Sequence, residues 1–136
     1  MVPNDFSWEV ALRAALHNLE QWADKGIAPP QTSRIELDAS LEVVRDADGN
    51  ALGGLRLPYV DVPTARYVGA LSESGMASIV GAKAPFDAAK LSALHQDHAN
   101  FMRKFFFATD RALKARLILP GDAADMEAAA AQAKVP

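Results

Sequence analysis

The sequence predicts an α+β fold, with an N-terminal amphipathic helix, a small antiparallel hairpin with extended segments in the middle, and C-terminal helices. Three observations lead to this prediction. Apolar residues recur at helical spacing over 7–25, turn residues and alternating polar and apolar residues fill 31–83, and aspartates that can cap helices precede apolar periodic segments in 87–133. A chain of 136 residues has the usual length of a single domain, so we expect one domain covering 1–136.

The segment from about Ser7 to Lys25 is expected to form a single helix. Asp5 or Ser7 can cap its start, and Gly26 can end it because glycine readily adopts the left-handed conformation found at helix ends. His17 lies beside the apolar face and is interpreted as a partly buried packing histidine. We expect that face to be buried against the core; it consists of Trp8, Leu12, Ala15, Leu16, Leu19, Trp22 and Ala23.

The middle zone is expected to contain the hairpin. Residues 34–38 alternate polar and apolar side chains, as a half-exposed strand does. Residues 46–50, Asp-Ala-Asp-Gly-Asn, have turn chemistry, and 52–57 can form the return strand. A calcium loop is disfavoured because an EF-hand needs glycine at its sixth position, and Gly49 is the fourth residue of this string. The pair Gly53-Gly54 indicates a bulge or a close approach of the backbone.

The C-terminal zone is expected to be helical. Asp87 can cap a short helix that ends near Leu94, and Asp97 can cap a longer one that ends near Arg116. Leu119-Pro120 interrupts the pattern, and a last helix with an alanine-rich tail follows from about Asp122. The buried face of the longer helix is predicted to be Phe101, Met102, Phe105, Ala108, Thr109, Ala112 and Leu113.

Phe107 lies outside that buried face. It is four residues after Arg103 and four before Arg111, so it shares a helix face with charged side chains. An aromatic residue at such a position does little for inward packing. We therefore expect Phe107 to mark a contact surface, with a lone exposed phenylalanine as the alternative.

Composition excludes several classes of function. A formal net charge of −3 and an isoelectric point near 5.5 argue against nucleic-acid binding, which needs a clustered basic excess. A chain without cysteine has no disulfides, thiolate metal ligands or cysteine nucleophile. No signal peptide follows Met1, and the apolar runs are shorter than the roughly 20 residues that span a bilayer. We expect a cytoplasmic protein with neither a nucleic-acid nor a membrane partner.

No catalytic motif stands out in the sequence. An α/β-hydrolase serine needs a glycine two residues before it and another two residues after it, and no serine here has both. The cluster His95, Asp97 and His98 has metal-ligand residue types, but a zinc site needs three or four ligands, so a helix junction capped by Asp97 is the favoured interpretation. We therefore assign no catalytic, cofactor-binding or metal-binding residue and expect no cofactor.

A longer set of motifs does carry information about ancestry. It begins with the helix described above and continues with 48–50, Asp-Gly-Asn, and the run 53–69, which contains Gly-Gly-Leu-Arg-Leu-Pro and Val-Pro. Pro85-Phe86 and 119–123, Leu-Pro-Gly-Asp-Ala, follow in order. Over nearly the whole chain, these motifs resemble the C-terminal part of the bacterial "alpha/beta hydrolase domain" proteins, which are esterase-like relatives of the α/β hydrolases.

The resemblance implies that the catalytic serine, acid and histidine of such hydrolases all precede the helix that begins near Ser7 in this chain. No triad residue can therefore be assigned to a position here. Three hypotheses stay open. The chain is a C-terminal portion of an esterase-like hydrolase that is inactive alone, or a small binding or homo-oligomeric assembly module of unknown ligand, or a small enzyme that uses His95, Asp97 or His98. The expected partner is a second copy or a complementary hydrolase chain.

Overall fold

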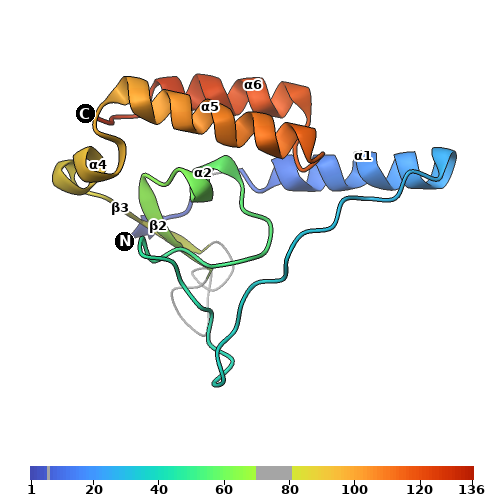
Figure 1. Ribbon diagram of the computed structural model, residues 1–136, viewed down its shortest axis with the longest axis horizontal. Helices are drawn as coiled ribbons and strands as arrows, with labels where there is room; N and C mark the ends of the chain where they lie inside the picture. Colours follow the sequence, from blue (N-terminus) through green and yellow to red (C-terminus); the bar gives the residue numbers. More distant parts are fainter. Residues whose placement is uncertain (6, 70–80) are drawn as a thin grey trace.

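The computed structural model describes residues 1–5, 7–69 and 81–136. It confirms the α+β class, with helices at both ends of the chain and a small antiparallel sheet between them (Figure 1). In chain order, the elements are β1 (Val2–Pro3), α1 (Glu9–Lys25), α2 (Pro58–Asp61), β2 (Ala65–Val68), β3 (Ala82–Pro85), α4 (Ala88–His95), α5 (His98–Lys114) and α6 (Pro120–Ala131).

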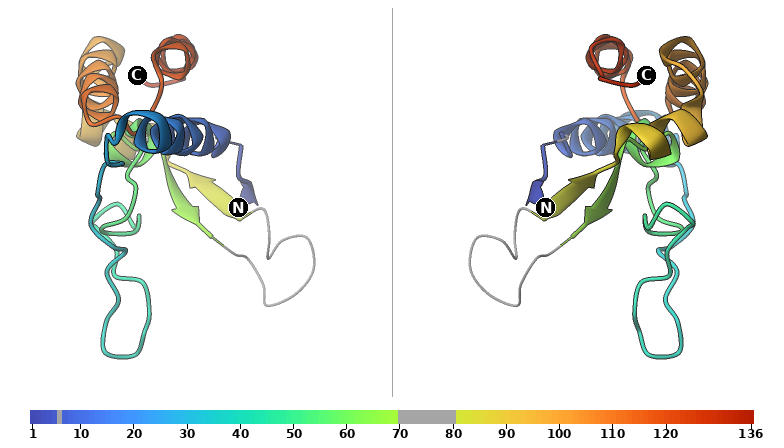
Figure 2. Two further views of the ribbon diagram at one scale, coloured as in Figure 1. Left: turned by 90° about the vertical axis from the view of Figure 1, so that its right-hand side faces the viewer. Right: turned by 90° about the vertical axis from the view of Figure 1, so that its left-hand side faces the viewer.

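The helices and the sheet occupy different parts of the molecule. Helices α5 and α6 lie side by side in one layer, and α1 and α2 lie below them (Figures 1 and 2). The sheet has the strand order β1-β3-β2, with Val2 opposite Lys83 and Tyr67 opposite Lys83 on the other side. The sheet and the long segment 26–57 both project from the helical layers (Figure 2), and they are joined where Asn50 bonds to β2.

The hydrophobic core lies between α5, α6 and α2. The face of α5 predicted to be buried is confirmed, with Met102 and Leu113 partly buried at its edges and the other members fully buried. The rings of Phe101 and Phe105 lie 5.8 Å apart, and Tyr59 from α2 packs on Phe105 at 5.7 Å. Each such buried aromatic side chain contributes roughly 1.5–3 kcal/mol through burial. Core residues from outside α5 are Val10, Leu57, Val62, Ile118, Ala123, Met126, Ala130 and Val135.

Most of the predicted helix ends are confirmed. The Asp87 side chain accepts a hydrogen bond from the Lys90 N–H at 2.8 Å, and Asp97 caps α5 in the same way. Gly26 ends α1 in the left-handed conformation, with φ of 68°. The start of α1 was predicted wrongly, because Trp8 occupies the cap position and no side chain caps the helix. Asp5 instead binds the Lys83 ammonium at 2.5 Å.

The predicted burial of the tryptophan face of α1 is wrong. Trp8 is 65% exposed and Trp22 is 55% exposed, and the buried side of α1 is the opposite one, formed by Val10, Ala14 and Asn18. Small side chains on that side let α1 approach the connection between α5 and α6. The amphipathic pattern identified one apolar face correctly but could not show which side of the helix meets the rest of the chain.

The predicted hairpin is shorter than expected. Single bridges join Leu37 to Val43 and Arg45 to Ala51, and no regular strand covers 52–57. The chain bends at Gly53 and Gly54, which both have φ near 70°. A Cβ atom on Gly53 would lie 2.0 Å from the Arg34 carbonyl oxygen, so the predicted close approach of the backbone is confirmed.

Candidate functional site

The cluster of His95, Asp97 and His98 lies at the junction of α4 and α5. The His95 side chain is 2% exposed, and its Nε2 atom lies 3.0 Å from the Pro63 carbonyl oxygen. Its ring packs edge-on against Phe101 at 5.0 Å, and the His98 ring also contacts Phe101, at 6.1 Å. Because Asp97 is the cap of α5, the three side chains join two helices and do not face one common point.

Burial determines the protonation of His95. Desolvation is the main cause that lowers the pKa of His95 below its ordinary value, and the nearby Lys104 ammonium lowers it further, against the opposing effects of the Pro63 carbonyl and Asp48. The neutral ring donates from Nε2 to Pro63, which leaves the Nδ1 lone pair buried without a partner. A neutral imidazole in this position holds the α4–α5 junction to the Pro63 backbone.

Within 1–5, 7–69 and 81–136, no group of three or more histidine, cysteine, aspartate or glutamate side chains is arranged to hold a metal ion.

A second polar cluster is centred on Arg56, in the Gly-Gly-Leu-Arg-Leu-Pro motif. Its guanidinium donates to Asp46 Oδ2 and to Asp61 Oδ1, both at 2.8 Å, and to the carbonyl oxygens of Ala51 and Val60. Arg111 on α5 binds the other oxygen of Asp61 at 2.6 Å. This cluster therefore links the 46–50 turn to α2, and α2 to α5.

The pKa shifts in this cluster follow from its hydrogen bonds. Burial alone would raise the pKa of Asp46, but hydrogen bonds from the Asn50 N–H, the Arg56 guanidinium and the Asp48 N–H together outweigh it, so the pKa lies below its ordinary value. Burial likewise opposes the charge of Arg56, and the two carboxylates overcome it and raise the pKa of Arg56. Both partners are therefore ionised at neutral pH, as a structural ion pair requires.

Asn50 fastens the same turn to the sheet. Its side chain is 1% exposed, accepts a hydrogen bond from the Tyr67 N–H at 2.7 Å and donates to the Ala65 carbonyl oxygen at 3.2 Å. Both contacts are on β2. The Asp-Gly-Asn motif is thus a turn whose last residue, Asn50, bonds to the edge strand β2 in the way that the backbone of a neighbouring strand would.

A cavity with a volume of about 730 Å³ lies beside the sheet. Its wall combines apolar rings, including Phe86, with two tyrosines, and burial is the main cause that raises the pKa of both Tyr59 and Tyr67. The paired side chains of Asp5 and Lys83 also line it. Cavities of this size and mixed lining are typical of small-molecule sites.

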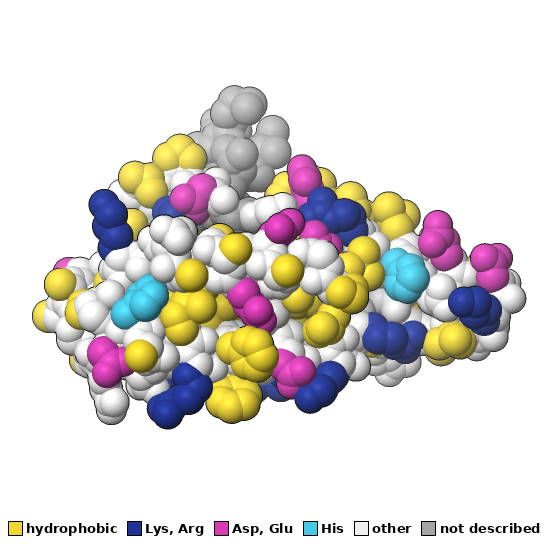
Figure 3. Space-filling view, turned by 90° about the horizontal axis from the view of Figure 1, so that it is seen from above, with side chains coloured by type: hydrophobic (Ala, Val, Ile, Leu, Met, Phe, Trp, Pro, Cys, Tyr) yellow, Lys and Arg dark blue, Asp and Glu magenta, His cyan; other side chains and the backbone are white. Residues whose placement is uncertain are grey.

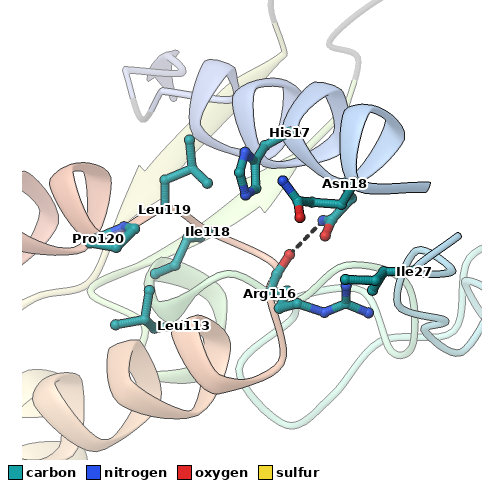
Figure 4. A pocket seen from close by; sticks show the side chains of 9 residues that line it. His17, Asn18, Ile27, Leu113, Arg116, Ile118, Leu119 and Pro120 are labelled. Carbon is teal, nitrogen blue, oxygen red and sulfur yellow. Dashed lines mark hydrogen bonds between the residues drawn. The ribbon is translucent and has the colours of Figure 1, made fainter. Parts of the chain in front are cut away.

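A smaller cavity of about 430 Å³ lies between α1 and the α5–α6 connection (Figure 4). Asn18 from α1 donates to the Arg116 carbonyl oxygen at 2.8 Å, which joins the two sides of the cavity, as the dashed line shows. His17 lines the cavity next to Asn18 but is exposed, so its predicted role as a partly buried packing residue is wrong. The apolar wall opposite α1 comes from Leu113, Ile118, Leu119 and Pro120.

Sequence reasoning did not identify the contacts of Asn50 and Arg56. The turn at 46–50 was predicted, but the partners of both side chains come from segments up to 17 residues away. The sequence did mark both residues, since Asn50 and Arg56 lie within the motifs that carried the family resemblance. Their contacts in this structure join separate segments of the fold.

Comparisons with known proteins agree with the resemblance. A family model described as "Alpha/beta hydrolase domain" matches residues 2–128. Neither the curated proteins nor the solved structures that were compared with the chain gave a match. In the described part of the chain, no helix has the length and apolar character needed to cross a membrane. Because the match covers nearly all of the 136 residues, the chain belongs to the alpha/beta hydrolase domain family.

Proposed function

We propose that the chain acts as the C-terminal portion of an esterase-like α/β hydrolase and is catalytically inactive by itself. The observation that carries this proposal is a family match over 2–128 in a sequence without any Gly-x-Ser-x-Gly motif. The uncovered apolar face of α1 supports it, because a helix of a complete domain normally buries such a face. One domain covers 1–136 in this proposal, and its location is the cytoplasm.

The cavity beside the sheet is the part of the chain that would contribute to a substrate site. Asp5 and Ser7 line it, and the chain enters α1 directly after them. The resemblance implies a catalytic histidine upstream of this helix, which supports the cavity as a surface that faces the substrate. Its aromatic and tyrosine lining suits an ester with an apolar group and a polar end.

Two measurements test the absence of catalysis. The purified chain is expected to leave nitrophenyl acyl esters unhydrolysed above background and to stay unlabelled by a fluorophosphonate, with an active serine esterase as the positive control. Both expectations follow from the missing nucleophile motif. Stoichiometric labelling of any serine would overturn the proposal.

A homo-oligomeric assembly module is the second candidate, and the exposed apolar face of α1 favours it. The third hypothesis, an enzyme that uses His95, Asp97 or His98, has less support because His95 is buried and Asp97 caps a helix. Turnover of any substrate that is abolished by His98→Ala would favour the third hypothesis over the other two.

A further inference from the structure

The apolar face of α1 is exposed from Trp8 to Trp22. Between Trp8 and Trp22, three leucines are each 46% to 54% exposed. We call Trp8, Leu12, Ala15, Leu16, Leu19, Trp22 and Ala23 the α1 stripe. By contrast, the surface over α5 and α6 mixes hydrophobic side chains with charged ones of both signs (Figure 3). A continuous apolar stripe of this size that is exposed to solvent marks an interaction site.

The area of the α1 stripe is large enough for a stable pair. Aromatic side chains can each bury 150–250 Å², so two half-exposed tryptophans and three half-exposed leucines present on the order of 600 Å². Two such stripes in contact would cover about 1,200 Å², which is the lower limit of specific protein interfaces. The exposed charged residues Glu9, Arg13 and Glu20 border the stripe and would form a polar rim.

The order of residues in the α1 stripe is nearly palindromic about a point between Ala15 and Leu16. Leu12 is three residues before Ala15, and Leu19 is three residues after Leu16. Trp8 near one end of the helix is matched by Trp22 and Ala23 near the other. A two-fold symmetric interface needs such self-complementarity, because residue i must meet residue j while j meets i.

We propose that two copies of this chain pair through α1, with the helices antiparallel and the two-fold axis near Ala15. In this arrangement, Leu12 of one copy packs on Leu19 of the second copy, and the tryptophans cover the two ends. The proposal goes beyond the proposed hydrolase relationship: in this chain by itself, a second copy covers the face that the rest of a complete hydrolase domain would bury.

Sedimentation equilibrium tests the pairing. The parent chain is expected to reach the mass of a dimer as its concentration rises. Leu16→Glu puts a charge at the centre of the interface and should raise the dissociation constant at least tenfold. Leu41→Glu is the matched control, since Leu41 is 77% exposed but lies outside α1. The control should keep the dimer, and far-UV circular dichroism should show both variants folded.

Single cysteines test the geometry, because the chain has none of its own. Ala15→Cys is next to the proposed axis and should form a disulfide with its copy. Leu12→Cys should not, because the two copies of residue 12 would be offset by about 10 Å along the helix axis, beyond disulfide reach. A mixture of Leu12→Cys and Leu19→Cys should form the mixed dimer.

Three results would overturn the proposal. The first is a parent chain that stays monomeric at its highest soluble concentration, which would leave the α1 stripe uncovered or assign it to a different partner. The second is a dimer lost in Leu41→Glu and kept in Leu16→Glu. The third is a Leu12→Cys variant that crosslinks to itself, which would make the helices parallel. Esterase activity in the parent chain would instead contradict the proposed function alone.

Discussion

Individual residues of the family motifs hold together segments that are distant in sequence. Asn50 replaces two backbone partners for β2, and Arg56 joins the 46–50 turn to α2. Buried polar groups of this kind stabilise a structure mainly because leaving a partner unsatisfied costs about 1–3 kcal/mol. The motifs that identified the family therefore specify how the sheet and the segment 26–57 connect to the helical core.

Gly53 provides a prediction at this scale. Gly53→Ala should destabilise the chain by about 2–4 kcal/mol, because φ is positive there and the new Cβ atom would press on the Arg34 carbonyl oxygen. Gly121→Ala is the control, since a Cβ atom on Gly121 in α6 meets no atom within 4 Å. Urea denaturation should show the control to be as stable as the parent or more so. Equal stability of the two variants would contradict the close approach.

His95 makes stability depend on pH. Its pKa is lower in the folded chain than the ordinary value of 6.5, so below that pH the unfolded chain binds the extra proton. The stability that depends on a neutral His95 is present above pH 6.5 and is lost as pH falls, with a slope of at most about 1.4 kcal/mol per pH unit. His95→Gln should flatten this decline below pH 6.5.

Denaturation at each pH measures the effect of His95. Identical slopes for the parent and His95→Gln would show that the imidazole does not change protonation on unfolding.

At the scale of helices and strands, local signals were sufficient for some predictions only. The caps of α4 and α5 and the buried face of α5 were predicted correctly, because a cap and its first turn, or a face and its period, lie within one segment. Which side of α1 is buried depends on the segments that surround the helix, so the apolar pattern alone predicted burial of the wrong side. The hairpin was predicted too long because Gly53 and Gly54 bend the chain instead of extending a strand.

The corrected orientation of α1 changes the expected effect of tryptophan substitutions. Burial of the α1 stripe in the core would make each Trp→Ala change cost about 3–5 kcal/mol. With both indoles more than half exposed, Trp8→Ala and Trp22→Ala should each cost under about 1 kcal/mol in the dilute monomer. Phe105→Ala in the core should cost about 3–5 kcal/mol.

Thermal melts of these three variants distinguish the two orientations. The order expected is a large loss of melting temperature for Phe105→Ala and small changes for the tryptophan variants. Equal losses for Trp22→Ala and Phe105→Ala would show that the tryptophan face of α1 is buried in the core.

At the scale of the whole molecule, the described residues bury a core and leave the apolar face of α1 open. The core between α2, α5 and α6 is closed by aromatic packing, whereas α1 contributes only Val10 to the core cluster. Pairing of two copies is the arrangement that the area and symmetry of the α1 stripe support.

Tryptophan fluorescence tests this account most directly, because the only two tryptophans of the chain are both in the α1 stripe. In dilute solution, the account predicts emission typical of indoles in water and efficient quenching by iodide. As concentration rises, emission should move to shorter wavelength and quenching should fall, with the same midpoint as the change in mass. Shielded, short-wavelength emission from the dilute monomer would contradict it, because the α1 stripe would then be buried within a single chain.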